Sequence, residues 1–121
     1  MEIGEVWFVN FPLEEDPTRS LLRPVIVLGE DLFMFISVKV TSHRVRRYDS
    51  YDIEIIDWRA AGLRVPSTAR VSKTIMLPQN NFLFKVGDLT TRDLRRIVET
   101  YERLRQDNPS VGLELNNMNL F

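Results

Sequence analysis

The stretch LLRPVIVLGE (residues 21–30) places one arginine at the entrance to a short apolar run. Residues 25–28 are branched, wholly apolar and bounded by a proline and a glycine, which is typical of a strand buried on both faces. Arg23 is permanently charged and cannot follow that strand into a core, so we expect it where the sheet meets water. A guanidinium held at such a position is suited to binding phosphate.

A second group of cations is interleaved with aromatic residues. Its members are Lys39, Arg44, Arg46, Arg47, Tyr48 and Tyr51, and Arg70 lies on the polar face of a later predicted strand. Cations that bind backbone phosphates, together with rings that stack on bases, are typical of proteins that bind single-stranded nucleic acid. The alternative is a solvated loop whose charges are balanced by Asp49, Asp52 and Asp57. The sequence leaves both interpretations open.

His43 is the only histidine in the chain, and there are no cysteines. The usual Cys/His zinc site cannot be built in one chain, so we predict neither a metal nor a cofactor. Imidazole exchanges protons readily near neutral pH, which makes His43 a candidate general acid. A lone histidine in a basic turn is more often an exposed loop residue, and we favour that interpretation.

The bulk composition limits the class of protein. A chain of 121 residues predicts one domain, and its net charge of −1 gives no bulk attraction for nucleic acid, so any such contact must come from a local patch. No apolar segment approaches the ~20 residues that span a bilayer, and the N-terminus lacks a basic region followed by an apolar signal core. We therefore expect a cytoplasmic protein without a membrane partner.

Strand-like alternation recurs along most of the chain. The predicted strands are residues 3–11, the strand entered at Arg23, then 35–41, 52–55, 68–77 and 82–86. In residues 35–41 the alternation predicts a polar, solvent-facing row of Ser37, Lys39 and Thr41. Residues 35–41 and 52–55 together suggest an antiparallel hairpin with a basic tip.

The C-terminal third predicts one amphipathic helix. Leu94, Ile97, Val98, Tyr101 and Leu104 form an apolar stripe at helical spacing, with Thr90 or Thr91 as the cap and Asp93 in the first turn. Several short strands followed by one helix predict a mainly β (α+β) fold, a small bent sheet or barrel that the helix covers. We expect residues 1–105 to form this domain and residues 106–121 to be a flexible tail.

Five segments, in order along the chain, carry a resemblance to a known family. They are GEVWFVNF near the N-terminus, RPVIVL from Arg23, VTS at residues 40–42, STARVSKTIML and GDLTTRDLRRIVETYERL. Together they span about residues 3–105. The sequence thereby resembles the MazF/PemK (Kid-like, CcdB-like) toxins of type II toxin–antitoxin systems.

The resemblance implies a fold, an activity and a site. It implies an SH3-like barrel, a homodimer, and a metal-independent endoribonuclease that cuts single-stranded RNA to a 2′,3′-cyclic phosphate and a 5′-hydroxyl. It also implies an antitoxin that neutralises the enzyme. The reaction centre would comprise Arg23 and Thr41, with Ser42 adjacent, and Glu15 or Asp16 would orient the arginine. The chain departs from the family in the loop before Arg23, which has no glycine.

Two other functions remain compatible with the residues. One is a non-catalytic barrel that binds RNA or a protein partner, because a fold does not dictate one function. The other is a toxin directed at DNA gyrase, as in the CcdB branch of the resemblance.

Overall fold

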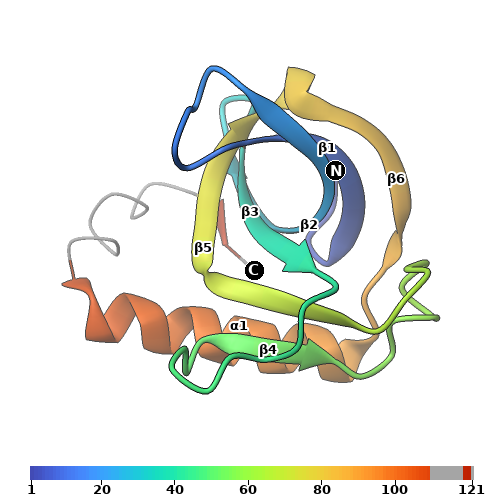
Figure 1. Cartoon of the computed structure of the whole chain (residues 1–121), viewed down its shortest axis with the longest axis vertical. Coiled ribbons are helices and arrows are strands. Elements are labelled where there is room, and N and C mark those ends of the chain that lie inside the picture. The colour runs from blue at the N-terminus through green and yellow to red at the C-terminus, as the bar shows by residue number, and fades with distance from the viewer. Residues whose placement is uncertain (110–118, 121) are drawn as a thin grey trace.

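A computed structural model describes residues 1–109 and 119–120, and Figure 1 shows a curled sheet with one long helix beside it. The strands are β1 (Glu5–Pro12), β2 (Ser20–Asp31), β3 (Met34–Thr41), β4 (Asp52–Ile55), β5 (Ser67–Pro78), β6 (Phe82–Asp88) and β7 (Asn119–Leu120). A 3₁₀ turn, η1 (Gln79–Asn81), precedes β6, and the helix α1 (Thr91–Asp107) follows it.

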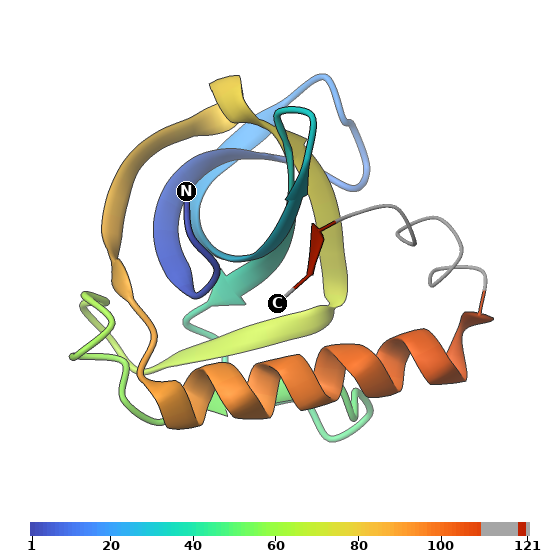
Figure 2. The ribbon, with the colours of Figure 1, turned by 180° about the vertical axis from the view of Figure 1, so that it is seen from behind.

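The sheet is antiparallel and runs in the order β4-β5-β3-β2-β1-β6, with β7 paired to β2 off this path. The described strands curl without closing into a complete barrel, and α1 runs along one side of them, as the two opposite views show (Figures 1 and 2). The prediction of a mainly β, barrel-like fold with a C-terminal helix is confirmed. No helix in the described part of the chain is long and apolar enough to cross a membrane.

Both faces of the central strands are buried. Residues 25–28 of β2 are almost completely inaccessible, as the unbroken apolar run predicts. Ile26 joins the larger core cluster, which includes Ile97 and Tyr101 of α1, whereas Val25 joins a smaller cluster with Val9 and Leu77. Because side chains alternate along a strand, each face of β2 faces one of the two clusters.

The predicted solvent-facing row in β3 is wrong. Ser37 has no exposed surface, and its hydroxyl donates to the carbonyl of Phe35 at 3.0 Å. Lys39 and Thr41 are half-buried. The curl of the sheet encloses this face, so a polar row that would be solvated on a flat sheet here runs from the interior to a rim.

The predicted hairpin of residues 35–41 and 52–55 is also wrong. Both strands exist, but β5 lies between them: Thr68 of β5 is paired with Thr41 of β3 and with Glu54 of β4. The long strand β5 offers a backbone edge to each side, and the loop 42–51 crosses over to bring β4 to its far edge. Alternation along a strand does not determine which neighbour it pairs with.

The predicted apolar stripe of α1 is confirmed in Ile97, Tyr101 and Leu104, which are all buried. The capping differs from the simple expectation. Thr90 is the N-cap residue, but its hydroxyl donates to the Asp57 carboxylate at 2.6 Å rather than to the helix. The helix continues to Asp107, and most of the predicted tail, residues 110–118 and 121, lies outside the described residues.

Candidate functional site

Arg23 and Thr41 line the same groove, which has a volume of about 700 Å³. The reason lies in the strand register: Val25 of β2 is paired with Lys39 of β3. Arg23 and Thr41 each lie two residues beyond this pair at the same end of the two antiparallel strands, so the register places them near each other. Ser42 follows Thr41 and also lines the groove.

Arg23 is half-buried at the rim of the curled sheet. Its guanidinium carbon lies 5.9 Å from the centre of the Phe11 ring, and the ammonium of Lys39 lies 5.7 Å from the same ring. No carboxylate of the described residues is within ion-pair distance of Arg23. Glu14 is the acidic group that acts on Lys39. Arg23 has no paired carboxylate of its own and lies beside a second cation, so this position attracts a negative ligand.

Burial shifts the protonation of both cations in the same direction. Burial lowers the pKa of Arg23. Burial, followed by the neighbouring charge of Arg23, lowers the pKa of Lys39. An anion in the groove therefore stabilises the charged form of Arg23, which lines it, and acts on Lys39 from the neighbouring position.

The hydroxyl of Thr41 is oriented by the chain that follows it. Its oxygen accepts a hydrogen bond from the backbone N–H of His43 at 3.2 Å. A hydroxyl carries one hydrogen and two lone pairs, so this bond leaves the hydrogen of Thr41 available to an acceptor in the groove.

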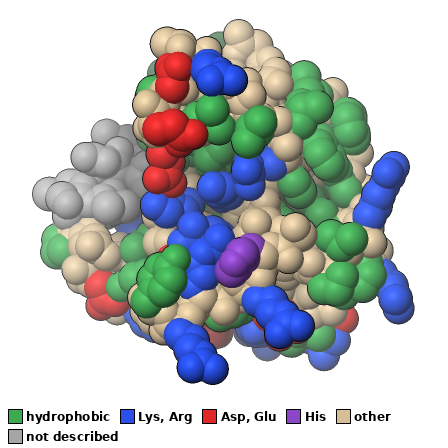
Figure 3. Space-filling view, viewed as in Figure 1, with side chains coloured by type: hydrophobic (Ala, Val, Ile, Leu, Met, Phe, Trp, Pro, Cys, Tyr) green, Lys and Arg blue, Asp and Glu red, His purple; other side chains and the backbone are tan. Residues whose placement is uncertain are grey.

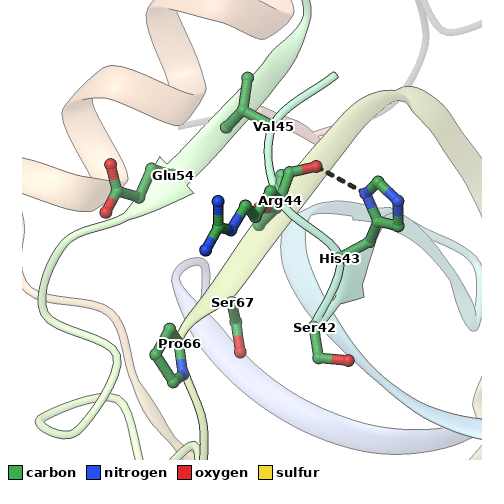
Figure 4. A pocket seen from close by; sticks show the side chains of 8 residues that line it. Ser42, His43, Arg44, Val45, Glu54, Pro66 and Ser67 are labelled. Carbon is green, nitrogen blue, oxygen red and sulfur yellow. Dashed lines mark hydrogen bonds between the residues drawn. The ribbon is translucent and has the colours of Figure 1, made fainter.

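His43 is exposed, and Figure 4 shows its ring pointing away from the guanidinium of Arg44. Its Nδ1 lies 2.8 Å from the carbonyl oxygen of Arg44. Because a carbonyl only accepts, Nδ1 must carry the hydrogen and the neutral ring keeps Nε2 as an acceptor. The favoured interpretation of His43 as an exposed loop residue agrees with this placement.

A second, smaller hollow of about 380 Å³ lies beside the first. Ser42 lines both hollows, and His43, Arg44 and Glu54 line only the second. The side chain of Arg44 extends across it between Glu54 and Ser67 (Figure 4). Arg44 is exposed and no ion pair in the described residues holds it.

The acidic loop between β1 and β2 does not supply an acid to the groove. The carboxylate of Asp16 accepts from the backbone N–H and the hydroxyl of Thr18, at 3.1 and 2.6 Å, so it shapes its own turn. Glu14 pairs with Lys73 at 3.0 Å. Glu15 is exposed. The structure therefore does not bring Glu15 or Asp16 to the lining of the groove.

The predicted RNA-binding cations fall into two sets. Arg70 is buried and binds both Asp52 at 3.0 Å and Asp49 at 2.9 Å. Arg46 binds Asp52 through its guanidinium and its backbone N–H. These two arginines anchor the loop 42–51, which is the balanced-charge alternative left open by the sequence.

The other set is open to solvent. Arg44, Arg47 and Tyr48 are exposed on the loop 42–51, and Lys39 lies half-buried beside Arg23. On the face in Figure 3, Lys and Arg side chains surround the single histidine, and hydrophobic side chains lie next to them. The cationic surface is therefore local, as the net charge of the chain requires.

The sequence analysis missed another part of the wall of the groove. Leu22, Arg64 and Phe84 line it, from β2, the turn before β5, and β6. The turn is placed by Gly62, which has a φ of +83° and sits so close to β6 that an added Cβ would lie 2.3 Å from the Val86 carbonyl oxygen. In the sequence, only the isolated Gly62 in a predicted connection indicated a tight turn here, and it did not indicate which strand the turn approaches.

Comparisons with known proteins agree with this architecture. A complex described as an endoribonuclease with its cognate antitoxin from Mycobacterial species is 11% identical, with a TM-score of 0.64 over 85% of this chain and 92% of that one. The Mycobacterium tuberculosis toxin MazF-mt6 is 18% identical, with a TM-score of 0.60 over 80% and 93%. A MazE–MazF crystal structure from Deinococcus radiodurans is 14% identical, with a TM-score of 0.64 over 86% and 93%.

At these identities the solved structures show a shared fold. A search of curated proteins gives no match. The model of the family described as PemK-like, MazF-like toxin of type II toxin-antitoxin system matches residues 2–104, which is most of the chain. On that match, and with a barrel-like sheet and a cationic groove arranged as described above, the chain belongs to the PemK/MazF family of type II toxins.

Proposed function

We propose that this chain is an endoribonuclease toxin that cleaves single-stranded RNA by internal transesterification and is held inactive by an antitoxin. The observation that carries the proposal is the meeting of Arg23 and Thr41 in one groove. The family match supports the role of toxin, and the fold is shared with a protein described as an endoribonuclease bound to its antitoxin.

The protein needs to supply few catalytic groups, because RNA carries its own nucleophile. The 2′-oxygen attacks the adjacent phosphorus, a P–O2′ bond forms, and the bond from phosphorus to the 5′-oxygen breaks. A proton leaves the 2′-hydroxyl and a proton reaches the 5′-oxygen. The products are a 2′,3′-cyclic phosphate and a 5′-hydroxyl, and the enzyme must stabilise the charge on phosphorus and move those protons.

Arg23 and Thr41 divide this task. The guanidinium offers paired donors to the phosphate oxygens, and no carboxylate among the described residues competes for it. The free hydrogen of Thr41 donates to another phosphate oxygen, and Lys39 adds positive charge from the same rim. Burial lowers the pKa of Arg23, so transfer of its proton to the departing 5′-oxygen costs less than it would from a solvated arginine.

The test of the reaction uses a pair of RNA oligonucleotides that differ by one 2′-deoxy nucleotide at the cleavage position. We expect cleavage of the all-RNA strand in EDTA, with cyclic-phosphate ends, and no cleavage of the substituted strand. Arg23→Ala should abolish cleavage, and Thr41→Val, which keeps the shape but loses the hydroxyl, should slow it by about a hundredfold or more. Arg95→Ala on the exposed side of α1 is the matched loss of charge and should cleave normally.

Other outcomes select other functions. Cleavage of the 2′-deoxy strand, or full activity of Arg23→Ala, contradicts the proposed mechanism. Saturable RNA binding without product would indicate a non-catalytic barrel. Growth arrest with intact RNA and damaged DNA supply would indicate a toxin directed at gyrase.

His43 lines the neighbouring hollow and not the groove, and a separate experiment tests whether its ring takes part in proton transfer. Its Nε2 is the free acceptor of the ring, and its backbone N–H already orients Thr41. His43→Gln keeps the backbone contact and removes the imidazole ring. If the ring transfers a proton, the variant cleaves RNA more slowly than the parent; if the rate is unchanged, the role of His43 is confined to its backbone.

A homodimer and an antitoxin complete the proposal. The fold is shared with a MazE–MazF complex, and this chain presents unpaired cations together with exposed apolar side chains. An antitoxin with an acidic segment and apolar anchors is complementary to that surface. Sedimentation of the purified chain tests the dimer, and loss of RNA cleavage on addition of the protein encoded next to it tests the antitoxin.

A further inference from the structure

The groove that contains Arg23 also has an exposed aromatic wall. Phe84 of β6 is 56% exposed and Leu22 of β2 is 62% exposed, and both line the groove. Neither residue belongs to either core cluster or to the side chains packed against one. Folding does not account for their position, because each keeps more than half of its apolar surface in water.

The Phe84 ring is held by a second aromatic ring that also lines the groove. Phe8 of β1 is its cross-strand partner, and the two rings stack with centroids 5.2 Å apart and an angle of 19° between their planes. Phe8 is half-buried and is paired on its other side with Pro24 of β2. Phe84 is therefore an ordered flat surface, so a ring that stacks on it loses little further conformational entropy of the protein.

The charge of the lining identifies the class of ligand. Three cations line the groove, Arg23, Arg64 and Lys85, and no Asp or Glu of the described residues does. Only Lys85 is held in ion pairs, with Glu5 and Asp88. A groove that combines unpaired guanidinium groups with an exposed aromatic face is complementary to a nucleotide, because the phosphates meet the cations and the base meets the ring.

We propose that Phe84, supported by Phe8, is a stacking subsite for the RNA base next to the scissile phosphate, and that Arg64 contacts the phosphate of that nucleotide. This inference rests on the proposed endoribonuclease function and adds a residue that positions its substrate. The groove, at about 700 Å³, has room for a base beside a phosphate held at Arg23 and Thr41. The stacked base holds the strand so that its 2′-oxygen stays aligned with the phosphorus.

The experiment compares three protein variants with substitutions in β6. Phe84→Ala removes the ring, Phe84→Trp keeps a stacking surface, and Leu83→Ala removes the preceding β6 side chain, which is 47% exposed but does not line the groove. Binding is measured with RNA made resistant by a 2′-deoxy nucleotide at the cleavage position. A second RNA also lacks the base at one neighbouring position.

We expect the loss of RNA affinity on removal of the Phe84 ring to depend on the presence of one particular base. Phe84→Ala should weaken binding of the complete strand by about tenfold to a hundredfold. Phe84→Trp and Leu83→Ala should remain near the parent. The RNA that lacks this base should bind the parent protein weakly. Phe84→Ala should not weaken the binding of that RNA further, because removal of either partner already removes the whole contact between the ring and the base.

Two results overturn the inference. One is equal weakening of the complete and abasic strands at every position tested. The other is unchanged RNA affinity in Phe84→Ala with an altered sedimentation coefficient, which would make this wall an interface between two copies of the chain. If RNA binds in a Phe84-dependent way but Arg23→Ala cleaves like the parent, then the catalytic proposal fails and the stacking subsite stands.

Discussion

Lys39 illustrates the conflict between stability and function at a single residue. Its ammonium lies over the same Phe11 ring as the guanidinium of Arg23. Burial, together with the charge of Arg23, lowers the pKa of Lys39 in the folded chain. The unfolded chain therefore holds this proton to higher pH, so the stability of the fold increases with pH between the lowered value and the ordinary 10.5. Below that window Lys39 is charged in both the folded and the unfolded chain, so the fold bears the full cost of its burial beside Arg23.

We therefore predict that Lys39→Met stabilises the fold and weakens RNA binding. At pH 7 the melting temperature should rise by about 1–3 °C. The gain should shrink as the pH approaches 10.5 and disappear above it, where lysine is neutral in both states. Thermal unfolding across this pH range is the measurement. The control is Lys73→Met, since Lys73 pairs with Glu14 and should give no such gain; a lower melting temperature for Lys39→Met would contradict the argument.

Arg70 shows what a residue type alone does not reveal. Arg70 was predicted to bind RNA because its strand face is polar, but Asp49 and Asp52 hold it in the interior. Those two carboxylates lie some twenty positions earlier in the chain, so no local pattern connects them. Arg23 was predictable because a fixed charge at the mouth of an apolar strand has only the rim of the sheet available to it.

At the scale of elements, the β2–β3 turn is strained. Asp31 is paired with Met34, and the two residues between them, Leu32 and Phe33, both have positive φ, 44° and 71°. Two-residue hairpin turns with this backbone favour Asn-Gly, because a bulky side chain costs about 1–2 kcal/mol in the left-handed region. The side chains recover little by burial, since they are 85% and 73% exposed.

We expect the double variant Leu32→Asn, Phe33→Gly to increase the free energy of unfolding by about 1–2 kcal/mol. Urea unfolding followed by circular dichroism measures it. Leu83→Asn, which also replaces an exposed apolar residue but at a strand position, serves as the control for the change in polarity and should not stabilise. A loss of stability in the double variant would show that the Leu-Phe tip makes contacts that offset its strain.

The extent of each element was predictable where its own periodicity carries the information. The stripe from Leu94 to Leu104 located α1, and the alternation in residues 52–55 located β4. The pairing of β4 with β5 instead of β3 was not predictable, because it depends on the crossing of the loop 42–51 and on the buried contacts of Asp52 that hold it. The groove wall formed by Arg64 and Phe84 depends on the same kind of non-local packing.

At the scale of the whole molecule, charge is separated although the net charge is only −1. Many acidic side chains are occupied: Asp49 and Asp52 hold arginines, Asp57 binds Arg92, and Asp93 accepts from two backbone N–H groups. Unpaired cations remain at the groove and on the loop beside it. The field that an anionic ligand meets as it approaches this face is therefore set by these cations rather than by the total charge.

This separation predicts a strong salt dependence in a mildly acidic protein. If three or four cations of the groove and loop contact phosphates, the affinity for a cleavage-resistant RNA should fall with a slope of about −2 to −3 in a plot of log affinity against log salt. Fluorescence anisotropy between low and moderate salt measures that slope. Arg64→Gln should reduce its size by about 0.7, because one phosphate contact is lost.

Arg95→Gln makes the same change in net charge on the exposed side of α1, outside the groove lining. If the local field governs binding, this variant leaves the slope unchanged. If both variants alter the slope equally, then total charge governs binding and the groove has no special role. A slope near zero for the parent chain would mean that phosphate contacts contribute little. The two guanidinium groups of the groove that have no carboxylate partner among the described residues, Arg23 and Arg64, would then need a different ligand.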